Sequence, residues 1–158
     1  MKYLLFSGAP GTGKTGSIAR LADMLIITKR FRVVSGHYPP IVPQKDFRVI
    51  LEGLDNRKNL IRIYLNSATD TKKIIKDCKA FYDANQPVDI IVSSIRDVFS
   101  VRTDFFAIMK VNNATDYLLE LPLGKVRRGT HRTLCLVWYE QKLDILVKHI
   151  LESNPFNL

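Results

Sequence analysis

The first 28 residues carry the pattern that most restricts how this chain folds. An apolar run at residues 2–7 predicts a short buried strand, and the glycine-rich stretch 8–13 follows it directly. Beyond it, apolar residues recur at offsets of three and four, which is typical of one buried helix face over 13–28; they are Ile18, Leu21, Ala22, Leu25 and Ile26. A strand joined to a helix by a tight glycine turn favours an α/β architecture.

The rest of the chain continues this alternation. We expect further strands at 31–34, 47–51, 60–65, 88–92 and 116–121, helices over 71–84 and 101–110, and a last helix ending near Leu151. Residues 134–137 fit either a strand or the start of that last helix. The polar stretch 55–59 between two β-rich runs predicts an antiparallel hairpin at about 46–66. The pattern predicts one α/β domain over 1–158 with a central, mostly parallel sheet.

The charge is unbalanced, because 24 Lys and Arg stand against 15 Asp and Glu, a formal net charge of +9. Such a surface attracts anions, and nucleotides, nucleic acids and acidic lipids all qualify. The 46% hydrophobic and 25% charged residues are ordinary globular usage, which excludes a disordered or collagen-like chain. No apolar run is long enough for a membrane span or a signal peptide, so we expect a cytoplasmic protein.

The cysteines and histidines are scattered, and none has the spacing of metal ligands; they are Cys78, Cys135, His37, His131 and His149. The sequence therefore predicts neither a disulfide scaffold nor a zinc site. We expect both thiols to be free and buried, as free cysteines usually are.

Residues 8–15, Gly-Ala-Pro-Gly-Thr-Gly-Lys-Thr, match the pattern G-x-x-x-x-G-K-[ST] in full. The glycines allow backbone angles and close approaches that a Cβ would block. Successive backbone N–H groups then form an anion-binding nest at a helix N-terminus. Lys14 reaches β- and γ-phosphates, and the Thr15 hydroxyl coordinates Mg²⁺. The candidate cofactor-binding residues are Gly8, Ala9, Pro10, Gly11, Thr12, Gly13, Lys14 and Thr15.

By this motif, and by its position between a strand and a helix, the chain resembles the P-loop (Walker A) NTPase superfamily. The resemblance is specific for the first strand, the glycine turn and the first helix, and looser for the α/β alternation that follows. It implies a three-layer P-loop fold that binds ATP or GTP with Mg²⁺. It does not by itself imply a reaction.

A phosphoryl-transfer site also needs a carboxylate near the metal. Asn66 follows the strand at 60–65, where the superfamily usually has Asp. Asp70 is either a metal or water ligand or the N-cap of the next helix. Asp97, after the strand at 88–92, serves either the metal or acceptor or a capping or surface role. An open α/β sheet binds its ligands at these strand ends.

Comparison with subfamilies favours a small kinase. Residues 94–97 keep only the Asp of the Asn-Lys-x-Asp motif of GTPases, and the chain has no Asp-Glu pair of the kind found in ABC and helicase-type motors. Small P-loop kinases place arginines after a late strand, and Arg96 and Arg102 fit that position. The planar guanidinium binds phosphate oxygens bidentately. The alternative for both is a solvated surface charge.

The segment Gly124–Arg132 carries four Lys or Arg residues and His131, with no carboxylate. A lid over phosphates, a loop beside the base and a nucleic-acid contact would each need such a segment. A turn with solvated charges is the simpler interpretation.

Two functions remain open. The first is a Mg²⁺-dependent, ATP-using enzyme that transfers a phosphoryl group to a small acceptor. Its catalytic residues would be Lys14, Arg96, Arg102 and Asp97, and its metal ligands Thr15 and Asp70. The second is a low-activity NTP-binding switch that contacts nucleic acid or a protein through its basic loop. The sequence does not specify the oligomeric state.

Overall fold

The structure is a computed structural model that describes residues 1–38, 45–126 and 132–158. The described residues form one six-stranded sheet in the order β2-β3-β4-β5-β1-β6. The strands are β1 (Lys2–Gly8), β2 (Phe31–Gly36), β3 (Arg48–Leu54), β4 (Leu60–Asn66), β5 (Ile90–Arg96) and β6 (Tyr117–Pro122). The helices are α1 (Lys14–Ile27), α2 (Lys72–Ala84), α3 (Phe99–Met109) and α4 (Arg132–Glu152).

The sheet is mixed. β4, β5, β1 and β6 pair in parallel, whereas β3 runs antiparallel to both of its neighbours, β2 and β4. The predicted hairpin is confirmed, because β3 and β4 pair from Arg48↔Asn66 to Leu54↔Leu60. The reversal of β3 has a consequence for the site: β3 begins at the edge of the sheet where β4 and β5 end.

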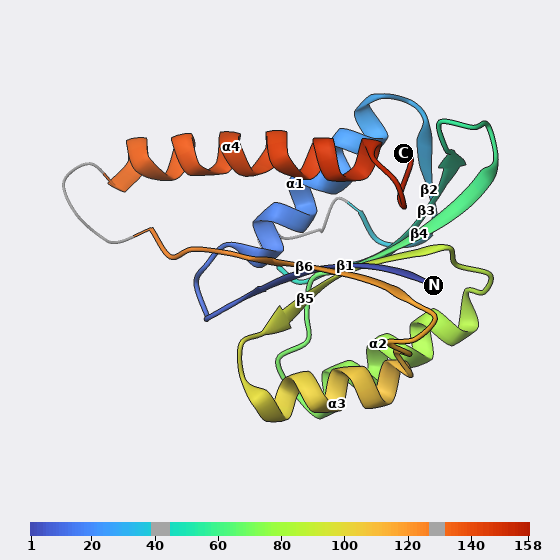
Figure 1. The fold of residues 1–158 in the computed structure, drawn as a ribbon, viewed down its shortest axis with the longest axis horizontal. Coiled ribbons are helices and arrows are strands. Elements are labelled where there is room, and N and C mark those ends of the chain that lie inside the picture. Colours follow the sequence, from blue (N-terminus) through green and yellow to red (C-terminus); the bar gives the residue numbers. More distant parts are fainter. Residues whose placement is uncertain (39–44, 127–131) are drawn as a thin grey trace.

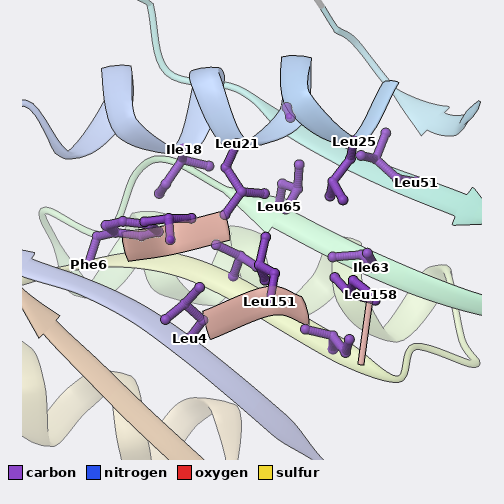
Figure 2. Packing of buried hydrophobic residues seen from close by; sticks show 14 of the residues in the cluster. Leu4, Phe6, Ile18, Leu21, Leu25, Leu51, Ile63, Leu65, Leu151 and Leu158 are labelled. Carbon is purple, nitrogen blue, oxygen red and sulfur yellow. The ribbon is translucent and has the colours of Figure 1, made fainter. Parts of the chain in front are cut away.

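Helices cover both faces of the sheet: α1 and α4 lie on one side, α2 and α3 on the other (Figure 1). The strands therefore bury side chains in two cores, and β1 alternates between them, with Leu4 and Phe6 on one face and Tyr3 and Leu5 on the other. Figure 2 shows the first core, where the buried side chains of α1 pack over the strands. The expected α/β class is confirmed.

Several predicted boundaries need correction. The ambiguous run at 134–137 is helical and belongs to α4. β5 extends to Arg96, four residues beyond the predicted end. The N-cap of α2 is Thr71, whose hydroxyl accepts a hydrogen bond from the Ile74 N–H, so the expectation that Asp70 caps this helix is wrong.

The expectation that Cys135 is buried is also wrong. Cys78 is buried as expected, but Cys135 is exposed, because a helix on the sheet surface buries only one side and Cys135 lies outside that side. Over the part of the chain that the structure describes, no helix is long and apolar enough to cross a membrane.

Candidate functional site

The glycine-rich loop between β1 and α1 adopts a conformation that needs its glycines. Gly11 and Gly13 have φ angles of 77° and 86°, in the left-handed region where a Cβ is strained. Gly13 is the N-cap of α1 and has no side chain with which to cap it. The first N–H groups of a helix lack intrahelical partners and carry its positive dipole end. The loop thus presents backbone donors to an anion.

Lys14 folds back over this loop. Its Nζ donates hydrogen bonds to the carbonyl oxygens of Gly8 at 2.7 Å and Ala9 at 3.0 Å. Burial lowers the pKa of the ammonium; of two nearby charges, Asp70 raises that pKa and Arg96 lowers it. The cation is therefore already positioned beside the backbone donors of the loop.

A cleft of about 630 Å³ opens in front of the loop, within the size range of small-molecule sites. It brings together the predicted side chains Lys14, Thr15, Asp70 and Arg96 with three residues of the predicted glycine-rich loop, Pro10, Gly11 and Gly13. These side chains come from the start of α1, the turn before α2 and the end of β5. The fold therefore assembles them from separate parts of the chain.

Asp70 and Arg96 form an ion pair at this cleft, with Nε of Arg96 2.6 Å from Oδ1 of Asp70. Both side chains are partly exposed. The pair lies beside Lys14, so the Arg96 guanidinium, the Lys14 ammonium and the Asp70 carboxylate face the same space.

Arg102 and Asp97 are not among the residues that line the cleft in the described part of the chain. Arg102 donates two hydrogen bonds to the Glu120 carboxylate, at 2.6 and 2.7 Å. These bonds raise the pKa of Arg102 and lower that of Glu120. The structure thus separates Arg102 from Arg96, although the sequence suggested that they act together.

The residues at the cleft that the sequence analysis does not predict include Asp46 and Ser67. Thr15 Oγ1 donates to Asp46 Oδ1 at 3.1 Å, and Ser67 Oγ donates to the same oxygen at 3.2 Å. Asp46 precedes β3, and β3 runs antiparallel to β4, so Asp46 lies beside the end of β4. The predicted hairpin at about 46–66 already implies this position, because its first residues lie opposite its last.

Asn66, which stands where an Asp was expected, is buried and turned into the interior. Its amide donates to the Ala68 carbonyl at 2.9 Å and to Ser93 Oγ at 3.0 Å, and its Oδ1 accepts from the Cys78 thiol. The side chain stabilises the end of β4, and its bonds leave it no part in the cleft.

A second hollow, of about 330 Å³, shares Gly11, Gly13, Arg20 and Glu140 with the first. Its wall includes three apolar or aromatic side chains, Val126, Leu136 and Tyr139. Residues 127–131 of the predicted basic segment lie outside the described residues, as does the side chain of Arg132.

The oxygen atoms that line the cleft can be compared with those that Mg²⁺ prefers. Mg²⁺ prefers oxygen ligands and is usually held by one or two carboxylates together with substrate phosphates. Thr15, Asp46 and Asp70 supply such oxygens around one space. Within residues 1–38, 45–126 and 132–158 there is no cluster of three or more His, Cys, Asp or Glu that would hold a metal alone. The donor set therefore suits a metal that arrives with a phosphate ligand.

Comparisons with protein-family models, with curated proteins and with solved structures each found no match.

Proposed function

We propose that this protein binds a nucleoside triphosphate, ATP or GTP, together with Mg²⁺ at the glycine-rich loop, and transfers the terminal phosphoryl group to a small acceptor. The observation that carries the proposal is the combination of left-handed Gly11 and Gly13 with the Lys14 ammonium drawn over the loop. Backbone donors and a fixed cation at one helix start are what a triphosphate requires.

In this proposal the phosphates lie along the loop, with the terminal one toward Lys14 and Arg96. The nucleoside enters the second hollow, whose apolar wall suits a base. When bound, Mg²⁺ neutralises charge on the β- and γ-phosphate oxygens. Lys14 and Arg96 stabilise the charge that develops on the transferring group.

During transfer, a bond forms between the acceptor oxygen and the γ-phosphorus. The bond from that phosphorus to the β–γ bridging oxygen breaks, and the nucleoside diphosphate leaves. The acceptor proton passes to a carboxylate, and in this proposal Asp70 takes that role, because Asp97 does not line the described cleft.

The second candidate is a nucleotide-dependent switch with little turnover. Two observations favour it: Asn66 gives β4 no carboxylate at the cleft, and Arg102 is committed to Glu120. Fewer catalytic groups then converge than in the kinase hypothesis.

Calorimetric titration with ATP and GTP, with and without Mg²⁺, tests the binding. We expect Lys14→Ala to weaken affinity at least about tenfold, because it removes the cation at the loop. Lys76→Ala, on the exposed side of α2, is the matched control. Unchanged binding by Lys14→Ala would refute the proposal.

Incubation with γ-labelled nucleotide and a panel of small hydroxyl and phosphate acceptors separates the two candidates. Label in an acceptor supports transfer. Tight binding with neither labelled product nor released phosphate supports the switch.

A further inference from the structure

We propose that Asp46, held by Thr15 and Ser67, is the carboxylate that fixes Mg²⁺ at this site, in place of the missing strand-end Asp. The inference rests on the proposed function, because the metal enters with the nucleotide. It assigns the metal to a residue outside every carboxylate position that the sequence motifs suggest.

The Thr15 hydroxyl is oriented toward Asp46. A hydroxyl has one proton and two lone pairs, and Thr15 donates its proton to Asp46 Oδ1 at 3.1 Å. The oxygen lone pairs are therefore free to coordinate a cation. The hydrogen bond to Asp46 thus orients Thr15 Oγ1 so that it can coordinate a metal ion. The Asp46 carboxylate lines the same cleft and can bind the same ion.

Hydrogen bonds between the start of β3 and the end of β4 hold Asp46 in place. The Phe47 N–H donates to Ser67 Oγ at 2.8 Å, and the Ser67 N–H donates to the Phe47 carbonyl at 3.1 Å. Ser67 is buried, and it also donates to Asp46. The start of β3 is thereby tied to the end of β4, so the carboxylate is positioned by the hairpin.

The carboxylates that line the described cleft differ in their partners; they are Asp46, Asp70 and Glu140. Asp70 is paired with Arg96, and Glu140 with Arg20 at 3.1 Å. Asp46 instead accepts its two hydrogen bonds from neutral hydroxyls. A bound cation would therefore be the first cationic partner of Asp46 among the described residues, whereas each of the other carboxylates is already paired with a guanidinium.

The experiment measures the metal without requiring turnover. Nucleotide affinity is determined in EDTA and in Mg²⁺, and Mn²⁺ binding to the nucleotide complex is followed by electron paramagnetic resonance. We expect Asp46→Asn to bind nucleotide in EDTA as the wild type does, to lose the increase in affinity that Mg²⁺ gives, and to bind Mn²⁺ about 10–100-fold more weakly.

Asp77→Asn is the matched control, since it removes an exposed carboxylate of α2 that does not line the described cleft and should keep the metal effect. Asp70→Asn is measured alongside it, because Asp70 is the competing candidate for the metal. Ser67→Ala keeps the Asp46 carboxylate but loses its anchor, so we expect a smaller loss. Thermal melting confirms that each variant is folded.

Retention of the Mg²⁺ effect by Asp46→Asn, or its loss in Asp70→Asn instead, would overturn the assignment. Failure of the wild type to bind nucleotide, both in EDTA and in Mg²⁺, is a different result. It would refute the proposed function, and the assignment of Asp46 would fall with it.

Discussion

Lys14 is a partly buried ammonium group, and its burial shifts its pKa. Burial lowers its pKa below the ordinary 10.5 in the free protein. Bound phosphates would favour the charged form and raise that pKa again. At a pH above the Lys14 pKa of the free protein, nucleotide binding must therefore be accompanied by protonation of Lys14.

The first prediction follows from this difference. Nucleotide affinity should fall as pH rises through the Lys14 pKa of the free protein, and the fall should begin at a lower pH than an ordinary lysine would give. Titrations at alkaline pH in buffers of different ionisation enthalpy measure the proton uptake. Lys14→Arg stays charged and should lose this pH dependence, whatever its absolute affinity. An equal slope in that variant would assign the titration to another group.

At the scale of elements, the pair of Arg102 and Glu120 joins α3 to β6. Both side chains are mostly covered, and the two hydrogen bonds are short. A bidentate pair of this kind stabilises more than a single exposed ion pair. The bonds lower the pKa of Glu120 in the folded protein.

We therefore predict that Glu120→Gln lowers the free energy of unfolding by about 1 kcal/mol at neutral pH. A lowered carboxyl pKa stabilises the fold above the pKa of the unfolded chain, and the contribution is lost as pH falls through the folded pKa. Urea denaturation at pH 7 and in acid should show that the difference in free energy of unfolding between wild type and variant becomes smaller as the pH falls. Arg102→Ala should show the same loss of stability with unchanged nucleotide affinity. If Arg102→Ala instead weakens nucleotide binding and leaves the free energy of unfolding unchanged, Arg102 acts at the nucleotide site.

The strands and helices that could be predicted from the sequence are those with a clear local period. β5 was predicted too short, because Ser93 and Ser94 are polar yet buried within the strand. Ser94 Oγ donates to the Ser67 carbonyl at 2.8 Å, so a tertiary hydrogen bond satisfies this buried hydroxyl. Periodicity alone cannot detect such bonds.

The candidate site likewise has a part that local sequence predicts and a part that depends on tertiary structure. The loop at 8–15 is one continuous stretch, and its residue types define its conformation without knowledge of the rest of the chain. Asp46 and Ser67 lie 21 residues apart and meet only because β3 is reversed. The ion pair of Asp70 with Arg96 likewise depends on the neighbouring positions of β4 and β5. Sheet topology, rather than residue type, places these groups.

At the scale of the whole molecule, the cleft touches most of the fold. Its walls come from the loop between β1 and α1, the start of β3, the ends of β4 and β5, the turn before α2, and α4. A ligand there contacts both the centre of the sheet and the helices packed on it. Its binding should therefore oppose global unfolding and not only local fraying.

The last prediction is the size of that effect. At a ligand concentration about 100 times Kd, binding adds about 2.7 kcal/mol, which for a chain of this length raises Tm by about 5–10 °C. The net charge of +9 also allows any anion to stabilise the fold by reducing repulsion. That general effect is screened by salt, whereas a site with built partners is screened much less. We expect Mg²⁺ with ATP or GTP to raise Tm in 0.3 M salt, while sodium chloride at equal ionic strength, the nucleoside alone and the Lys14→Ala variant do not reproduce the shift. Equal stabilisation by sodium chloride would mean that the shift comes from the charge excess and not from the glycine-rich loop.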